Sequence, residues 1–329
     1  MDKIIGLGNA LVDVLATLKD DTLLDEMGLP KGSMQLIDDA KLQQINSKFS
    51  QMKTHLATGG SAGNAILGLA CLGAGTGFIG KVGNDRYGDF FRENLQKNNI
   101  ENKLLLTEQL PSGVASTFIS PGGERTFGTY LGAAASLKAE ELSLEMFKGY
   151  AYLFIEGYLM QDHEMILHAI ELAKEAGLQI CLDMASYNIV ASDLEFFSLL
   201  INKYVDIVFA NEEEARAFTG EEPKEALRMI AKKCSIAVVK VGANGSYIRK
   251  GTEEIKVDAL PVAQVLDTTG AGDYFAAGFL YGLTCGYSLE KCAKIGSILS
   301  GNVIQVIGTT MPAERWDEIK LNINRILAE

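Results

Sequence analysis

A short glycine-containing turn lies between two carboxylates and directly before an apolar stretch. The turn is Asp267-Thr268-Thr269-Gly270-Ala271-Gly272-Asp273, and the apolar run extends from Tyr274 to Leu283. We expect a helix to begin here, and the unpaired N–H groups of a helix start attract an anion. A carboxylate beside that anion can take a proton from a hydroxyl that attacks it. The pattern therefore suggests phosphoryl transfer to an alcohol.

Two polar residues follow the first strand-like run, in Gly6-Leu7-Gly8-Asn9-Ala10-Leu11-Val12-Asp13. The segment looks like part of a dinucleotide fingerprint, but Leu11 replaces the third glycine and the residues after it are typical of a strand. Alternatively, Asn9 and Asp13 point into the crevice where α/β proteins bind ligands, and Asp13 accepts hydrogen bonds from sugar hydroxyls. A turn asparagine and a surface aspartate are the simpler interpretation.

A second glycine turn, Gly59-Gly60-Ser61-Ala62-Gly63-Asn64, opens the helical run Ala65–Leu72. Paired glycines let a ligand approach the backbone, and Asn64 offers both a donor and an acceptor. The simpler alternative is a helix N-terminus that is capped by Ser61.

Two further strand ends carry polar residues. Asn211 and Glu214 share a helix face, where an amide and a carboxylate can hold water around Mg²⁺, although acidic residues in a first helical turn also stabilise the helix dipole. The segment Lys240-Val241-Gly242-Ala243-Asn244-Gly245 either faces a nucleotide or is a plain hairpin turn. No P-loop, protein-kinase or GxSxG signature occurs in the sequence.

Composition narrows the class of protein. The 329 residues have a formal charge of −12, which argues against a nucleic-acid or anionic membrane surface. The five cysteines are scattered, with no CxxC pair, and read as buried thiols of a reducing compartment. With no signal-peptide pattern and no membrane-length apolar run, we expect a cytoplasmic protein.

Short apolar, strand-like runs occur at residues 3–7, 76–79, 152–155, 178–183, 207–210 and 237–241. They alternate with amphipathic stretches such as 163–175 and 224–233, which predicts a parallel sheet covered by helices on both faces. Two segments, at about 14–57 and 112–131, break the alternation. The second has β-forming residues on both sides of Pro121-Gly122-Gly123-Glu124, a hairpin signal. We expect these segments to form a small β-lid on an α/β core made of residues 1–13, 58–111 and 132–329. A lid excludes water, from which phosphoryl transfer benefits.

The order of these motifs resembles the PfkB, or ribokinase-like, carbohydrate kinase family over nearly the whole chain. Its C-terminal signature is similar to the Asp267–Asp273 turn, its N-terminal glycine signature is similar to Gly59–Asn64 with Gly80–Gly88, and its Asn-x-x-Glu motif matches Asn211 and Glu214. The resemblance implies a three-layer α/β/α sandwich with a small β-sheet lid. It also implies ATP- and Mg²⁺-dependent phosphorylation of a hydroxymethyl group.

The resemblance also implies roles for individual residues. Asp273 would be the base, and Gly270, Ala271 and Gly272 would supply the anion hole. The acceptor would be bound by Asn9, Asp13, Gly59, Gly60 and Asn64, and Arg125 would contact the transferred phosphate. The nucleotide would bind near Lys240, Gly242, Gly245 and Thr269. Mg²⁺ would be organised by Asn211 and Glu214, and a monovalent cation such as K⁺ would bind near Asp267 and Thr269.

Within the family the chain resembles the adenosine kinase branch, on Gly8–Asp13, Gly59–Asn64 and Thr129–Ala134. An apolar wall for a purine would come from the lid, with Met34, Leu36 and Phe118 as candidates that also suit core packing. Ribose, fructose and other sugars are the alternative acceptors. A non-catalytic sugar- or nucleoside-binding protein and a nucleotide-dependent oxidoreductase are the rival classes. The lid strands are a candidate surface for a homodimer.

Overall fold

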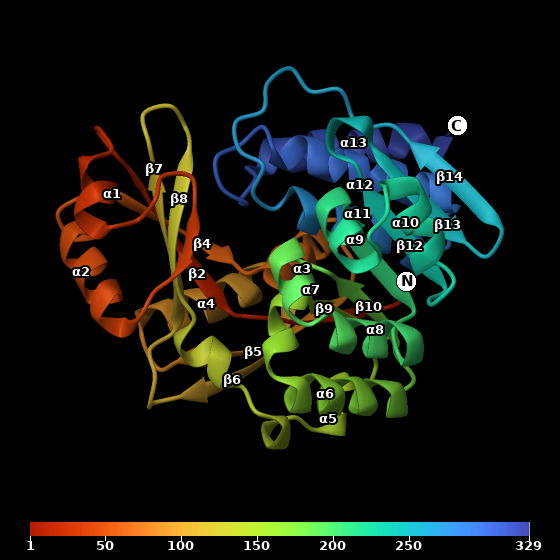
Figure 1. Ribbon diagram of the computed structural model, residues 1–329, viewed down its shortest axis with the longest axis horizontal. Helices are drawn as coiled ribbons and strands as arrows, with labels where there is room; N and C mark the ends of the chain where they lie inside the picture. The colour runs from red at the N-terminus through yellow and green to blue at the C-terminus, as the bar shows by residue number, and fades with distance from the viewer. Residues whose placement is uncertain (329) are drawn as a thin grey trace.

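A nine-stranded sheet forms the centre of the molecule, whose computed structural model describes residues 1–328 (Figure 1). The strand order is β14-β13-β12-β11-β10-β9-β1-β5-β6. The seven strands from β12 to β6 pair in parallel, and β13 and β14 add an antiparallel edge. Their bounds are β1 Ile4–Leu7, β5 Thr76–Gly83, β6 Ile100–Thr107, β9 Tyr152–Glu156, β10 Gln179–Asp183, β11 Ile207–Asn211, β12 Ile236–Lys240, β13 Ser246–Lys250 and β14 Glu253–Val257.

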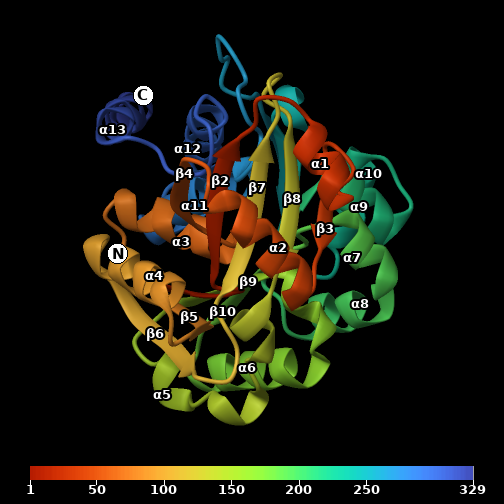
Figure 2. The same cartoon turned by 90° about the vertical axis from the view of Figure 1, so that its left-hand side faces the viewer.

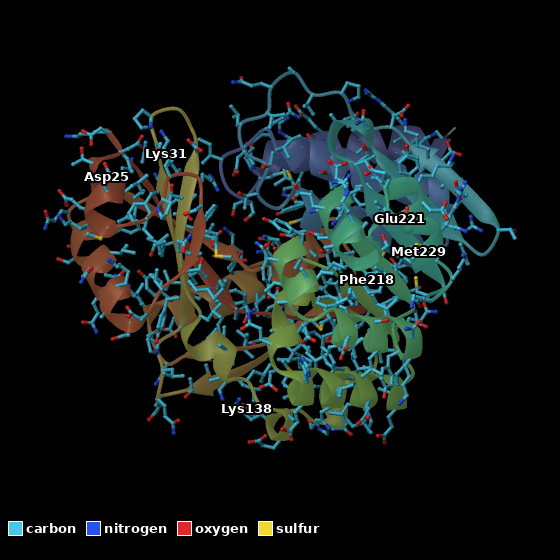
Figure 3. All side chains as sticks on the ribbon, viewed as in Figure 1. Asp25, Lys31, Lys138, Phe218, Glu221 and Met229 are labelled. Atoms are coloured by element: carbon cyan, nitrogen blue, oxygen red, sulfur yellow. The ribbon has the colours of Figure 1, made fainter. Side chains whose placement is uncertain are left out.

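A separate five-stranded sheet stands beside this core, with the order β3-β8-β7-β2-β4. Its strands are β2 Leu11–Thr17, β3 Met34–Leu36, β4 Thr54–Gly59, β7 Gly113–Ile119 and β8 Arg125–Tyr130. The helices α1 (Thr22–Met27) and α2 (Asp39–Phe49) cover its outer face (Figures 1 and 2). We call this sheet with its two helices the lid. Lys31, labelled in Figure 3, bonds to Asp21 at 2.6 Å on its exposed surface.

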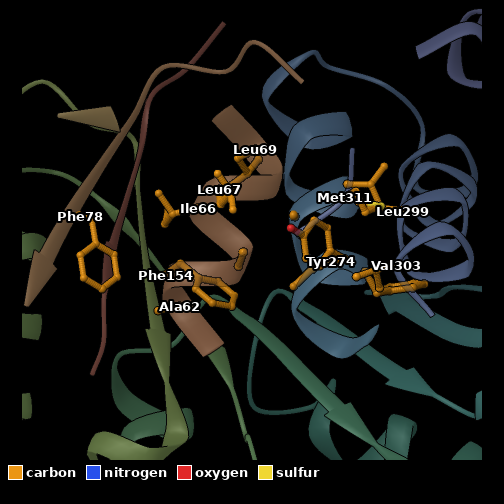
Figure 4. Close-up of a cluster of buried hydrophobic side chains, with 14 of the residues drawn as sticks. Ala62, Ile66, Leu67, Leu69, Phe78, Phe154, Tyr274, Leu299, Val303 and Met311 are labelled. Carbon is orange, nitrogen blue, oxygen red and sulfur yellow. The ribbon is translucent and has the colours of Figure 1, made fainter. Parts of the chain in front are cut away.

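Helices cover both faces of the central sheet, as the alternating sequence pattern predicts. One face packs against α3 (Ser61–Cys71), α4 (Arg86–Lys97), α11 (Ala271–Thr284), α12 (Leu289–Val303) and α13 (Ala313–Ala328). The other packs against α5 (Leu144–Phe147), α6 (His163–Glu175), α7 (Tyr187–Ser192), α8 (Leu194–Lys203), α9 (Glu212–Thr219) and α10 (Pro223–Ile230). Figure 4 shows Ile66 and Leu67 of α3 between the sheet and Tyr274 of α11. Tyr274 is buried, and its hydroxyl donates to the carbonyl of Thr309 at 2.6 Å.

The predicted architecture, a three-layer α/β/α sandwich with a small β-lid, is confirmed. The two expected lid segments both contribute to the small sheet, which extends slightly beyond them, from Leu11 and as far as Gly59. A strand, β2, follows β1, so the dinucleotide fingerprint lacks the helix that it needs. Within residues 1–328, no helix has the length and apolar character needed to cross a membrane.

The topology fixes where a ligand binds. The chain runs from β1 to β5 and β6 on one side and from β9 to β12 on the other, so the strand order reverses between β1 and β9. In open α/β sheets, ligands bind outside the carboxyl ends of the strands at such a reversal. Asn9 and Glu156, which follow or end these two strands, lie at that point.

Candidate active site

A cavity of about 1150 Å³ lies at the carboxyl edge of the central sheet and is bounded by the lid. It brings together segments that are distant in the sequence. Of the seventeen residues expected to have a catalytic, binding or metal role, fourteen line it, namely Asn9, Asp13, Gly60, Asn64, Asn211, Glu214, Lys240, Gly242, Gly245, Thr269, Gly270, Ala271, Gly272 and Asp273. Gly59, Arg125 and Asp267 do not line the cavity.

Asp273 lies in the first turn of α11 and is held by the first turn of α3. The Ser61 hydroxyl donates to Asp273 Oδ1 at 2.6 Å, and the Asn64 amide donates to Oδ2 at 2.8 Å. Burial raises the pKa of Asp273 to about 6, and these two hydrogen bonds oppose the rise. The N-cap of α3 is Gly60, with φ 84°, and not Ser61. The Ser61 hydroxyl therefore bonds to the carboxylate of another helix and does not cap its own helix.

The turn before Asp273 has the features of an anion-binding helix start. Gly270 is the N-cap of α11 with φ 77°, a conformation that favours glycine. The Ala271 N–H bonds to the Thr268 carbonyl at 3.2 Å. Within residues 1–328, the N–H groups of Gly272 and Asp273 form no hydrogen bond, so these two are available to an anion.

Asn9 is fixed by Glu156, a buried carboxylate at the end of β9. Glu156 Oε1 accepts from the Asn9 backbone N–H at 3.0 Å and from its side-chain amide at 2.8 Å, and Oε2 accepts from the Ala62 N–H at 2.8 Å. Burial raises the pKa of Glu156 to about 7, although three N–H donors oppose the rise. A Cβ on Gly8 would lie 2.6 Å from Oε2, so only glycine allows this approach. Glu156 thus joins the β1–β2 turn to α3.

Asp13 extends from β2 of the lid into the cavity. Burial raises its pKa to about 7, an effect that the charge of Arg125 partly offsets. Gly59 on the neighbouring strand β4 makes room for it, because a Cβ there would lie 2.3 Å from Asp13 Oδ1. The role of Gly59 in the structure is therefore indirect.

Lys240 ends β12 and lies among carboxylates. Its ammonium donates to Asp183 Oδ2 at 2.9 Å, and a Cβ on Gly272 would lie 2.9 Å from its Nζ. Burial lowers the pKa of Lys240, but the charges of Asp183 and Glu214 outweigh this effect and raise the pKa overall. Lys240 is therefore a charged group beside the anion-binding turn. Gly245, with φ 88°, lies in the turn of the β12–β13 hairpin and also lines the cavity, so the segment is both a hairpin turn and part of the cavity wall.

Asn211 and Glu214 form a reciprocal cap at the start of α9. The Asn211 backbone N–H and amide donate to Glu214 at 2.8 and 2.7 Å, and Asn211 Oδ1 accepts from the Glu214 N–H at 2.8 Å. Burial raises the pKa of Glu214, and Lys240 opposes the rise. Each Glu214 oxygen accepts one hydrogen bond and so keeps a second lone pair, and both residues line the cavity. This oxygen-rich pair therefore fits the donor chemistry that Mg²⁺ prefers.

Arg125 and Asp267 bind each other. The Arg125 guanidinium at the start of β8 lies 3.0 Å from Asp267 Oδ2, and both side chains are more than nine-tenths buried. Asp267 also accepts from the N–H groups of Thr269 at 3.0 Å and Gly308 at 2.9 Å. The positive charge next to Asp267 is therefore a guanidinium, and the pair ties the lid to the turn that precedes Asp273.

The lid presents apolar side chains to the cavity. Met34 and Leu36 line it, as predicted, whereas Phe118 does not. Phe118 is fully buried on the outer face of the lid sheet, where its ring lies 4.9 Å from that of Phe49, so its role is core packing. The remaining wall residues are Leu11, Phe127 and Leu131. The alternation of side chains along β8 predicts that Phe127 faces the cavity only once the pairing of β8 with β7 is known.

Sequence reasoning missed two buried carboxylates, Glu156 and Asp183. Both end an apolar strand, in Leu153-Phe154-Ile155-Glu156 and Ile180-Cys181-Leu182-Asp183. A carboxylate directly after a buried parallel strand is itself a signal, because the carboxyl ends of such strands meet at the ligand-binding edge.

Comparisons with known proteins agree with this geometry. Residues 32–316 match the family described as pfkB family carbohydrate kinase. The structure of adenosine kinase from Sinorhizobium meliloti superposes with a TM-score of 0.86 at 34% identity, covering 98% of this chain and 99% of that one. The structure of a probable sugar kinase from Rhizobium etli superposes with a TM-score of 0.87 at 34% identity, covering 98% of both chains. The 5-dehydro-2-deoxygluconokinase of Geobacillus thermodenitrificans is 28% identical, over 89% of this chain and 92% of its own.

The fold, the site and these relatives define a phosphotransferase that acts on an alcohol group. The chain belongs to the pfkB carbohydrate kinase family, whose kinases in general use ATP and Mg²⁺. The resemblance to the adenosine kinase branch is confirmed. Its acceptor is a sugar or a nucleoside.

Proposed function

We propose that this kinase transfers the γ-phosphate of ATP to the 5′-hydroxyl of adenosine and so forms AMP. One observation carries the choice of a nucleoside. The cavity has a polar end at Asn9, Asp13 and Asn64, beside Asp273, and an apolar lid wall that includes Met34 and Phe127. A ribose occupies the polar end, and the apolar wall offers a surface to a purine ring. A free sugar would leave that wall without a partner.

In this proposal the acceptor hydroxyl lies between Asp273 and the γ-phosphate. Asp273 accepts the hydroxyl proton as the oxygen attacks phosphorus. Ser61 and Asn64 hold both carboxylate oxygens, which directs a remaining lone pair to the cavity. With a pKa of about 6, the carboxylate is ionised at neutral pH and is a stronger base than an ordinary aspartate.

The anion-binding turn and Lys240 act on the phosphoryl group. The free N–H groups of the turn face developing charge on the phosphoryl oxygens, and each well-placed donor contributes about 3 kcal/mol to the transition state. The ammonium of Lys240 adds a positive charge at the same place. Asn211 and Glu214 would hold Mg²⁺ through water, and when bound this ion supplies charge neutralisation for the ATP phosphates.

A sugar kinase is the second candidate, and it is favoured by the similarity to a 5-dehydro-2-deoxygluconokinase. A screen of ATP consumption with adenosine, other nucleosides, ribose, fructose and tagatose separates the two. We expect the highest kcat/KM with adenosine and AMP as the product. A higher kcat/KM with any free sugar would transfer the proposal to that sugar. Failure of every acceptor would revive a non-catalytic binding protein.

Three finer points are also proposals. Higher kinase activity in KCl than in choline chloride would support a K⁺ site at Asp267, whose carboxylate is already paired with Arg125.

The edge strand β4 of the lid offers unpaired backbone groups to a second copy of the chain, and sedimentation velocity tests whether such a dimer forms. A cytoplasmic location is supported by five free cysteines and tested by fractionation.

A further inference from the structure

Several carboxylates in the cavity attract the ammonium group of Lys240. Its ammonium bonds to Asp183, is attracted by Glu214 and Asp273, and lies next to Gly272, the residue before Asp273. A cation this close to a carboxylate base can pair with it, and a base in an ion pair is a weaker proton acceptor. Something must therefore hold the ammonium away from Asp273.

Asp183 has the geometry for that task. Its side chain is 5% exposed, and its Oδ1 accepts from the Ala185 N–H at 2.9 Å, while Oδ2 accepts from the Lys240 ammonium. Ala185 has φ 63°, a left-handed conformation that non-glycine residues rarely adopt. The strained loop and its hydrogen bond orient the carboxylate, as local strain does at functional sites.

We propose that Asp183 is a positioning residue, which holds the Lys240 ammonium beside the anion-binding turn and prevents it from pairing with Asp273. The ammonium then stays available to the transferred phosphoryl group, and the base stays free for the acceptor. This inference rests on the proposed role of Asp273 as the base.

The charge balance around Asp273 makes the inference measurable. The titratable and charged groups whose fields reach Asp273 are Asp13, Glu156, Tyr158, Asp183, Glu214, Lys240 and Tyr274. The charge of Asp183 raises the pKa of Asp273 and that of Lys240 lowers it. Removing Asp183 and releasing Lys240 toward Asp273 therefore act in the same direction.

The experiment follows the titration of Asp273 by carbon-13 NMR of labelled aspartate carboxyls, with Asp273→Asn as the assignment control. In Asp183→Asn we expect the Asp273 midpoint to fall by about one pH unit. The acid limb of kcat should move with it, and kcat on the plateau should fall. Asp183→Glu, which keeps the charge, should restore most of the wild-type midpoint. An unchanged midpoint in Asp183→Asn would overturn the proposal.

Lys240→Met is the second variant, in case Asp183→Asn does not fold. Loss of the ammonium should raise the Asp273 midpoint, and an unchanged midpoint would mean that Lys240 does not lie beside the turn, which would contradict the proposal. Where Asp183→Asn folds, it should lower the midpoint less in the Lys240→Met background than in the wild-type background. An equal fall in both backgrounds would also contradict the proposal, because Asp183 would then act on Asp273 by its own charge and not through Lys240. Glu141→Gln is the matched control. It breaks another pair with a buried lysine, Lys81–Glu141 at 2.7 Å, outside the cavity, and should leave the midpoint unchanged. The NMR titration needs no acceptor, so failure of the proposed function in the acceptor screen is distinguishable from failure of this inference.

Discussion

At the residue scale, Glu156 is the least expected component of the site. Within residues 1–328 its two oxygens accept three N–H hydrogen bonds, and the ionised carboxylate satisfies all of these donors. Glu156→Gln would set an amide NH₂ against at least one of these N–H groups. We expect acceptor KM to rise about 10- to 100-fold, which corresponds to about 1–3 kcal/mol for an unsatisfied buried group. The KM for ATP should change little.

Steady-state kinetics with either substrate varied will measure this split. Glu101→Gln is the control, because Glu101 also accepts from two donors, Lys3 and Tyr150, but lies outside the cavity. An equal loss for ATP and acceptor would contradict the role given to Glu156.

Residues that belong to a motif were the ones that sequence reasoning could find. The turn before Asp273 has a sequence typical of a helix start that carries an acidic residue, and Asp273 and residues 268–272 line the cavity. Asp183 and Glu156 stand alone after apolar strands, and their partners are 57 and 147 positions away in sequence. No local pattern records such pairs, because they depend on the strand order.

At the element scale, the start of α3 positions the acceptor side. Gly60 has φ 84°, and a Cβ there would lie 2.2 Å from the Asn9 carbonyl oxygen. We expect Gly60→Ala to displace α3 or the β1–β2 turn, to cost about 1–3 kcal/mol of unfolding free energy, and to reduce kcat/KM for the acceptor. Chemical denaturation and kinetics measure the two effects.

Gly63→Ala, three residues further along α3, is the matched control. A Cβ there would meet only ordinary contacts, 3.7 Å from Phe91, and alanine favours a helix. This variant should equal or exceed the wild type in stability. If Gly60→Ala behaved like Gly63→Ala, the backbone of Gly60 would have no special role.

Elements were predictable to the extent that their pattern is local. The apolar runs predicted β1, β5 and β9 to β12, and the hairpin turn predicted β7 and β8. The lid sheet itself was less accessible, because β2 pairs in parallel with β7, about 100 residues later in the chain, and antiparallel with β4. Which face Phe118 takes follows only from that pairing.

At the scale of the whole molecule, the Arg125–Asp267 pair joins the lid to the core. Removing one partner of a buried ion pair leaves an uncompensated charge, which typically costs about 3–5 kcal/mol. We therefore expect Asp267→Asn to lower the unfolding free energy by this order and to loosen the lid. Denaturant titration measures the first effect, and hydrogen exchange of β8 measures the second.

Lys31→Ala is the control for that prediction. Its pair with Asp21 also lies on the lid, but it is exposed to solvent, so we expect little or no change in the unfolding free energy. A loss in Asp267→Asn as small as that in Lys31→Ala would mean that the buried pair does not hold the lid to the core.

The most direct test of the account is AMP formation from ATP and adenosine by the wild-type protein and by Asp273→Asn. We predict that the wild type forms AMP and that kcat falls about 10²- to 10⁴-fold in the variant, since it has lost its general base. Adenosine binding, measured by calorimetry, should be roughly retained. Near-normal turnover in Asp273→Asn would contradict the assignment of Asp273 as the base.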